Sequence, residues 1–273
     1  MPGLRALPGL RASAPALLLL VALVFARGSL AVQQLQPGSR SAAAAAWVAL
    51  QYRNFQAGSL GGLRALGQVR KATLKNIPES GHKYYLQFST EDYRTGEDAG
   101  NCLATVLYPK KKSRPVVSIK CSHTKDKKEI QEEDNTFYQR LRHQSKPITA
   151  NNIPDSYGNI EPALEPVWTL AVLGSSSIMW EKSTETLEYF LAQVKSVRQW
   201  IRKDDFVEFD YTVLLHEMPT QEIISCHMRL TWLPGQPLKV KHFCDSEAHG
   251  ADQGSGAESG SAAGPSAEKG ASF

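Results

Sequence analysis

The sequence lacks the signals of the common enzyme classes. It has no P-loop and no G-x-G-x-x-G loop, the glycine-rich turns that hold phosphates and dinucleotides. His216-Glu217 resembles the start of a zinc-protease motif, but Pro219 follows where a helix and a second histidine are required. Gly174-Ser175 lacks the second glycine of a nucleophile elbow, so we interpret Gly174 as a point of close helix packing. We therefore expect a protein that is not an enzyme and needs no cofactor.

Cysteine is scarce, and its spacing does not favour a metal site. The chain has four cysteines and seven histidines. Zinc sites usually contain close pairs such as C-x₂-C, and here only His227 stands beside a cysteine, Cys226. Disulfide bonds formed in an oxidising compartment are the first interpretation, and a metal site is the alternative. The histidines are scattered, so we expect no bound metal.

The N-terminal apolar run is too short to cross a membrane. It extends from Ala14 to Ala26, about 13 residues, whereas a spanning helix needs about 20. Arg5 and Arg11 precede it, and its end resembles a cleavage site. Residues 1–28 are therefore predicted to be a signal peptide of a secreted, extracellular protein. The alternative is an uncleaved signal anchor, which would make the chain a single-pass membrane protein.

Two segments of the chain share one plan. Each has a cysteine, a strand-like run, a turn with proline, a second run and another cysteine. The first segment extends from Cys102 to Cys121, and the second from Cys226 to Cys244, at offsets of 124 and 123 residues. A repeat of this length indicates two similar domains, since solenoid units are usually 20–50 residues. Because each cysteine pair brackets a single turn, we predict disulfides Cys102–Cys121 and Cys226–Cys244.

The periodicity of apolar residues predicts an α+β fold of two modules, each with one helix on a four-stranded antiparallel sheet. Module 1, residues 41–123, has a helix from Ser41 to Phe55, followed by strands at 63–77, 82–93, 102–108 and 116–122. Module 2, residues 160–246, has a helix at 167–180 and strands at 186–201, 206–217, 223–232 and 238–243.

Three further segments complete the predicted organisation. Residues 124–146 form an amphipathic linker helix, in which Asp126 and Glu129 have the spacing of a capping box. Residues 147–166 are rich in turn formers and are predicted to be a loop. Residues 247–273 are predicted to be a disordered, acidic tail, because they consist mainly of glycine, serine and alanine with few apolar side chains.

The helix predicted at 167–180 is apolar on nearly all sides. Such a helix must be covered on two sides, and its own sheet can cover only one. We therefore expect the modules to form one rigid body, with a junction that contributes to the partner surface. The residues expected to pack between modules are Trp47, Phe137, Leu141, Trp168, Leu173 and Trp180.

Basic residues gather near the predicted linker helix. A solvated hairpin tip is the first interpretation, and a patch that binds sulfated glycans, phosphate or a mineral matrix is the alternative. We expect no nucleic acid partner. The residues of this predicted basic patch are Lys110, Lys111, Lys112, Arg114, Lys125, Lys127 and Lys128.

A helix followed by a four-stranded meander with a cysteine-paired hairpin resembles the cystatin fold, and two such units joined by a helix resemble the latexin family. The resemblance covers roughly residues 40–246. The segments that carry it are Leu173–Trp180, Leu191–Gln199, Asp210–Glu217, Pro219–Glu222 and Lys239–Lys241. It implies an inhibitor of zinc metallocarboxypeptidases that docks over the enzyme by surface contact, so that a zinc carboxypeptidase is the expected partner.

Two alternatives remain within that resemblance. The first is a structural protein of eggshell or other extracellular matrix that keeps the fold without inhibition. The second is a membrane-anchored, retinoid-responsive regulator of cell proliferation, which requires the uncleaved anchor. Thiol-protease inhibition is not expected, because Ile77-Pro-Glu-Ser-Gly81 retains only the glycine of the cystatin Q-x-V-x-G loop and no glycine lies between Trp200 and Phe206.

Overall fold

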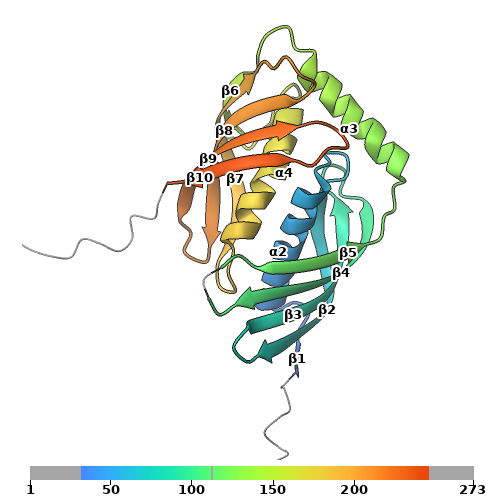
Figure 1. Ribbon diagram of the computed structural model, residues 1–273, viewed down its shortest axis with the longest axis vertical. Coiled ribbons are helices and arrows are strands. Elements are labelled where there is room, and N and C mark those ends of the chain that lie inside the picture. The colour runs from blue at the N-terminus through green and yellow to red at the C-terminus, as the bar shows by residue number, and fades with distance from the viewer. Residues whose placement is uncertain (1–31, 112, 246–273) are drawn as a thin grey trace, which may run out of the picture.

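The computed structural model describes residues 32–111 and 113–245. The predicted signal peptide (1–28), the predicted tail (247–273) and Lys112 lie outside these described residues. The chain forms two five-stranded antiparallel sheets, with helices α2 and α4 side by side between them and α3 along one side (Figure 1). This arrangement confirms the α+β class and the tandem modules.

Each sheet follows the chain as a simple meander. Sheet A has the order β1-β2-β3-β4-β5 and contains Val32–Leu35, Arg64–Ile77, Gly81–Asp92, Asp98–Pro109 and Val116–Cys121. Sheet B has the order β10-β9-β8-β7-β6, in which β6 to β10 are Thr149–Ile153, Glu188–Trp200, Val207–Met218, Ile223–Trp232 and Lys239–Cys244. The helices are α2 (Arg40–Ala57), α3 (Lys127–Arg142) and α4 (Glu165–Lys182).

The prediction of four strands per sheet is wrong by one strand in each module. The missed strands, β1 and β6, each precede the module's helix and pair with the edge of the sheet, β1 with β2 and β6 with β7. The loop predicted at 147–166 therefore contains a strand. Both strands are short and largely polar, VQQL and TANNI, so they show little of the apolar alternation that marks a strand in sequence.

The two disulfides join residues that lie directly opposite each other on neighbouring strands. Cys102 on β4 pairs with Cys121 on β5, and Cys226 on β9 pairs with Cys244 on β10. This is the pairing predicted from the repeat. Cys102 and Cys226 are fully buried, so both bridges lie on the faces of the sheets that cover the helices.

Helix α2 is defined by its caps and by its small side chains. The Ser39 side chain accepts a hydrogen bond from the backbone N–H of Ala42, and Gly58 ends the helix in the left-handed conformation that glycine adopts without strain. Its buried residues include five alanines, which let the helix lie close to both sheet A and α4. The alanine-rich sequence thus favours a helix with neighbours on more than one side.

The hydrophobic cores of the two modules are shared. The core over sheet A includes Trp180 of α4. The core over sheet B includes Leu60 and Leu63, which follow α2, together with Phe137 and Leu141 of α3. Each module thus completes the core of the other, as expected from the apolar character of α4.

Helix α3 is anchored to module 1 by carboxylates. Asp126 caps it by accepting from the backbone N–H groups of Lys128 and Glu129. The buried Asp134 accepts a hydrogen bond of 2.8 Å from the N–H of Gly61. Just before the helix, Lys125 Nζ lies 2.8 Å from Asp92 and 2.7 Å from Glu133. The linker is therefore packed against the module and does not swing free.

Two tryptophans, one from each of the helices α2 and α4, hold the modules together by reciprocal contacts. Trp47 of α2 donates its indole N–H to the carbonyl oxygen of Tyr189 at 3.1 Å. Trp168 of α4 donates its own to the hydroxyl of Tyr93, also at 3.1 Å. Each helix therefore places one indole against the opposite module.

Truncating Trp168 should loosen the junction. Trp168→Ala is expected to lower the free energy of unfolding by about 2–4 kcal/mol, since a half-buried aromatic ring is lost. Trp168→Phe keeps most of the ring but loses one hydrogen bond, so about 1 kcal/mol is expected. The control Ile201→Ala, at a side chain that is 71% exposed, should change stability by less than about 0.5 kcal/mol. Equal stability of Trp168→Ala and the control in urea unfolding would contradict this account.

Asp92 should make stability depend on acid pH. Burial alone would raise its pKa, but hydrogen bonds from Lys125 and from the backbone N–H groups of Thr95 and Arg94 bring the pKa below its ordinary value. A carboxyl with a lowered folded pKa stabilises the fold above its unfolded pKa, near 3.9, and loses that contribution as pH falls through the folded pKa.

We therefore expect Asp92→Asn to cost about 1–3 kcal/mol at pH 7 and to unfold with a shallower pH dependence below about pH 4. The neighbouring, exposed Glu91→Gln is the control and should leave the profile unchanged. Unfolding by urea at pH 2 to 7 measures both. If Asp92→Asn and the parent lose stability in parallel as pH falls, the carboxylate does not carry this effect.

Candidate functional site: the β8–β9 hairpin beside the module junction

Each module places a buried carboxylate at the start of an equivalent hairpin, β3–β4 in module 1 and β8–β9 in module 2. Asp92 ends β3 in module 1, and Glu217 lies at the end of β8, 125 residues later, at the repeat offset. Both side chains are almost fully buried, at 7% and 6% exposure. Each supports the turn that follows it, but with different partners. The comparison of these two hairpins identifies the surface that is available for a partner.

In module 1 the side chains of the β3–β4 hairpin contact Lys125 and helix α3. Lys125 binds Asp92, and the guanidinium of Arg94 lies 2.8 Å from Glu133 of α3 and over the ring of Phe137. Tyr93 accepts the hydrogen bond from Trp168. This hairpin is therefore part of the junction.

In module 2 the β8–β9 hairpin, residues 216–223, is held by side chains of the same module. Glu217 accepts hydrogen bonds from the hydroxyls of Tyr189 and Thr220. Its backbone N–H donates to the carbonyl of Glu222, and the N–H of Gln221 donates back to the carbonyl of Glu217. The turn is thus fixed before any partner binds, which lowers the entropy cost of association.

The tip of this hairpin faces solvent. Residues 219–223 are all exposed, and Ile223 is an exposed aliphatic side chain with 54% of its surface accessible. The His216 ring nitrogen Nε2 lies 3.1 Å from the amide oxygen of Gln221 across the turn. The hairpin therefore offers one apolar side chain and several fixed polar groups on a short protrusion.

The hairpin begins beside the module junction. On β7, Tyr189 pairs with Glu217, and its carbonyl accepts the indole N–H of Trp47. The next residue, Phe190, stacks on the Trp47 ring with centroids 4.5 Å apart. A partner at the tip would thus approach a surface supported by both modules.

Two turns correspond to the cystatin Q-x-V-x-G loop, the β2–β3 turn in module 1 and the β7–β8 turn in module 2. The residues at these turns bond to other parts of the molecule. In module 1, Glu185 of module 2 lies 2.7 Å from His82 Nδ1 and accepts from the hydroxyl of Tyr84. Burial, with the Glu185 contact, raises the pKa of Tyr84 well above its ordinary value. A Cβ at Gly81 would lie 2.0 Å from the carbonyl oxygen of Tyr108, which gives that glycine a packing role within the sheet.

In module 2 the corresponding end of the sheet is also joined to other elements by hydrogen bonds. The Tyr138 hydroxyl of α3 donates to the carbonyl of Asp205, and the Trp232 indole donates to the carbonyl of Gly58. These contacts involve the β7–β8 and β9–β10 turns. The β8–β9 tip lies at the opposite end of the sheet from both turns, and its residues 219–223 are exposed.

The residues predicted to pack between modules lie at or near the junction. Trp47 and Trp168 make the reciprocal contacts, and Phe137 and Leu141 are buried in the core over sheet B. Trp180 contacts Tyr52 of α2 and donates its indole N–H to the carbonyl of Pro115. Leu173 lies inside the core over sheet B.

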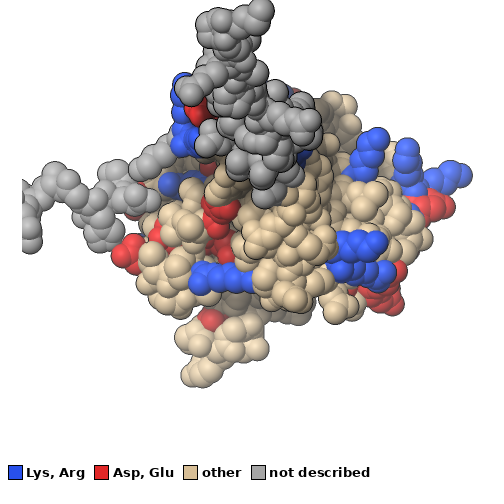
Figure 2. Space-filling view, turned by 90° about the horizontal axis from the view of Figure 1, so that it is seen from below, with Lys and Arg blue, Asp and Glu red and all other residues tan. Residues whose placement is uncertain are grey.

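The structure does not bring the predicted basic patch together. Lys110, Lys111 and Arg114 precede β5, and the cluster at Lys125, Lys127 and Lys128 follows it, so a strand about 20 Å long separates the two groups. Arg114 lies over the Trp180 ring, and Lys125 is bound by Asp92 and Glu133. On the face that Figure 2 presents, lysine and arginine side chains lie in several separate groups, some of them beside acidic side chains.

The sequence reasoning missed the fixed β8–β9 hairpin. The signal that could have found it is the repeat, because the offset of 125 residues aligns Glu217 with Asp92. Within residues 32–111 and 113–245, no group of three or more histidine, cysteine or acidic side chains is placed to hold a metal ion. In the same part of the chain, no helix is both long enough and apolar enough to cross a bilayer.

Comparison with known proteins connects this architecture to a family. The family model described as Latexin matches residues 35–250. Ovocalyxin-32 of Gallus gallus is 51% identical over 98% of this chain and 100% of its own length. Retinoic acid receptor responder protein 1 of Homo sapiens is 43% identical over 81% of this chain and 77% of its own. Latexin of Homo sapiens is 39% identical over 77% of this chain and 95% of its own.

Solved structures with a similar arrangement include mouse fetuin-B, alone and in complex with crayfish astacin. The likeness to fetuin-B alone has a TM-score of 0.30 and 14% sequence identity, over 78% of this chain and 70% of that chain. The astacin complex gives 0.29 and 16%, over 80% of this chain and 70% of that chain. The family model and the curated relatives together cover both modules and the linker helix, and the chain belongs to the latexin family.

Proposed function

We propose that the protein inhibits zinc metallocarboxypeptidases by docking onto the enzyme surface. The observation that carries the proposal is that the chain belongs to the latexin family, because resemblance to that family implies this activity. The rigid two-module body, which presents a fixed and exposed hairpin, supports it. Inhibition by surface docking requires a complementary shape and no catalytic group. A body held by a shared core can meet an enzyme without the cost of ordering flexible parts.

We further propose that the β8–β9 hairpin contacts the enzyme. It combines an exposed apolar side chain, Ile223, with polar groups held by Glu217, and interface hot spots pair such anchors with surrounding polar contacts. One hairpin supplies less than the roughly 800 Å² per partner of a standard interface. The adjoining surface near the junction would supply the remainder.

We propose that the protein acts outside the cell, after removal of residues 1–28. The two disulfides support this site of action, since such bonds form and persist in oxidising compartments. The competing proposal is that residues 1–28 are not removed and anchor the chain in a membrane, where it would regulate cell proliferation. N-terminal sequencing of the protein recovered from the medium of expressing cells distinguishes a cleaved from an uncleaved form.

A structural role in an extracellular matrix is the second candidate function. It is supported by the full-length match to ovocalyxin-32, which includes the parts of this chain that the match to human latexin leaves uncovered. The proposal of a mineral partner can be tested by co-sedimentation with calcium carbonate. Sedimentation without carboxypeptidase inhibition would favour this second function.

Inhibition should be measurable directly. The purified mature protein is expected to inhibit a pancreatic-type zinc carboxypeptidase, with loss of hydrolysis of a C-terminal peptide substrate as its concentration rises. Ile223→Asp should raise the inhibition constant at least about tenfold, because a charge is placed in the buried part of the contact. The matched control is Leu103→Asp on sheet A, where the side chain is 62% exposed, and inhibition should be unchanged.

The two parts of the proposal can fail separately. Absence of inhibition by the parent protein at micromolar concentration rules out the carboxypeptidase function. Inhibition by the parent with equal inhibition by Ile223→Asp keeps the function and excludes the hairpin as the contact. Thermal unfolding of both variants shows that neither result comes from a loss of fold.

A further inference from the structure

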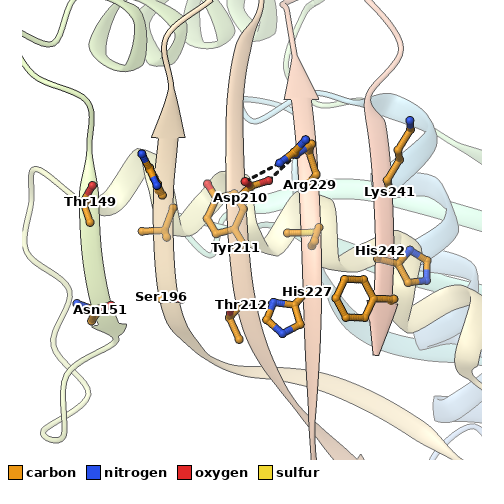
Figure 3. A pocket seen from close by; sticks show the side chains of 14 residues that line it. Thr149, Asn151, Ser196, Asp210, Tyr211, Thr212, His227, Arg229, Lys241 and His242 are labelled. Carbon is orange, nitrogen blue, oxygen red and sulfur yellow. Dashed lines mark hydrogen bonds and ion pairs between the residues drawn. The ribbon is translucent and has the colours of Figure 1, made fainter. Parts of the chain in front are cut away.

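The outer face of sheet B, which points away from α4, contains a groove of about 560 Å³. Two rows of side chains cross its five strands, as the register requires and as Figure 3 shows for the labelled residues. The first row, which we call the charged row, is Thr149, Arg198, Asp210, Arg229 and Lys241. The second, the polar row, is Asn151, Ser196, Thr212, His227 and Phe243.

The charged row has one internal ion pair and two remaining cations. Arg229 donates to Asp210 from Nε at 2.6 Å and from Nη2 at 2.8 Å. These bonds lower the pKa of Asp210, so the pair stays ionised and neutral as a unit. Within the part of the chain that the structure describes, neither Arg198 nor Lys241 forms an ion pair. The row therefore presents two positive charges to a ligand.

One aromatic ring, that of Trp200, contacts both arginines of the charged row. The guanidinium carbon of Arg198 lies 4.4 Å from the centre of the Trp200 ring, and that of Arg229 lies 5.9 Å from it. The Trp200 indole N–H donates to Asp210. Fixed guanidinium groups bind anions with a smaller loss of side-chain entropy than free ones.

The polar row adds hydrogen-bonding groups and one exposed ring. Thr212 Oγ1 lies 3.3 Å from His227 Nδ1. The His227 ring stacks on Phe243 with centroids 4.8 Å apart, and Phe243 is 65% exposed. Asn151 is exposed at the edge of the groove. Cations thus lie beside neutral hydrogen-bonding groups and an apolar ring.

We infer that this groove binds an acidic polysaccharide that carries sulfate or carboxylate groups. Its anions would lie against Arg198 and Lys241, its hydroxyls would meet the polar row, and a sugar ring would pack on Phe243. Arg198 is on β7 and Lys241 is on β10, three strand spacings or about 14 Å apart. An extended ligand with repeated charges spans that distance, whereas a single small anion does not.

The geometry disfavours two other polyanionic partners. An extended peptide gains affinity by pairing with free backbone groups at a sheet edge, but β7, β8 and β9 lie under the centre of the groove and are paired on both sides. A single-stranded nucleic acid stacks successive bases on several aromatic faces. Of the two exposed rings at this face, Trp200 is already in contact with two guanidinium groups, which leaves Phe243 alone for stacking. A sugar chain needs only side-chain contacts.

Titration calorimetry of the purified mature protein with heparin tests the inference. The double variant Arg198→Ser/Lys241→Ser should raise Kd about tenfold or more. Phe243→Ala, which removes no charge, should raise Kd roughly threefold, since the loss of an exposed aromatic contact is smaller. The matched control is Lys71→Ser/Lys120→Ser, which removes the same charge from the exposed outer face of sheet A and should leave Kd within about twofold.

Four results would overturn the inference. They are absence of heparin binding, an equal loss of affinity in the groove and control variants, an unchanged Kd in Phe243→Ala, and binding of poly-glutamate as tightly as heparin. The second result would indicate attraction by net charge, and the last would indicate an acidic peptide. Carboxypeptidase inhibition by the groove variant should stay at the parent level, which separates this site from the hairpin and reports a folded protein.

Discussion

The packing of α4 between sheet B and α2 is the constraint on which the rest of this structure depends. The helix is buried along almost its whole length, from Val167 to Trp180, so neither module could leave it uncovered without exposing a large apolar surface. Covering it on both sides places residues of each module in the core of the other. The same packing fixes the two sheets relative to each other, and a rigid body follows from the burial of one helix.

Helix α3 gives the duplicated modules different surfaces. Asp92 and Glu217 occupy equivalent positions, but α3 and Lys125 lie against the first hairpin, whereas Tyr189 and Thr220 of its own module hold the second. The same helix contacts the β7–β8 turn through one hydrogen bond from Tyr138. A symmetric pair of modules thereby acquires one hairpin that is bound to the linker helix and one that is held by side chains of its own module.

In this molecule strand register, and not closeness in sequence, decides which positively charged side chains lie next to each other. Lys110, Lys111 and Arg114 are separated by β5 from the basic residues that follow it. In contrast, Arg198, Arg229 and Lys241 are far apart in sequence but lie in one row, because antiparallel pairing aligns them across sheet B. Register can thus assemble a binding surface that no local sequence pattern indicates.

The sequence by itself determined the two-module plan, the three helices, eight of the ten strands to within a few residues, and the disulfide pairing. Periodicity, caps and the repeated cysteines are local signals, and each follows from the spacing of residues along the chain. It did not determine β1 and β6, because short polar edge strands depend on a partner strand for their conformation. Only the tertiary structure decided which of the two equivalent hairpins binds the linker helix and which cations stand together, because side-chain contacts and cross-strand register depend on elements that are distant in sequence.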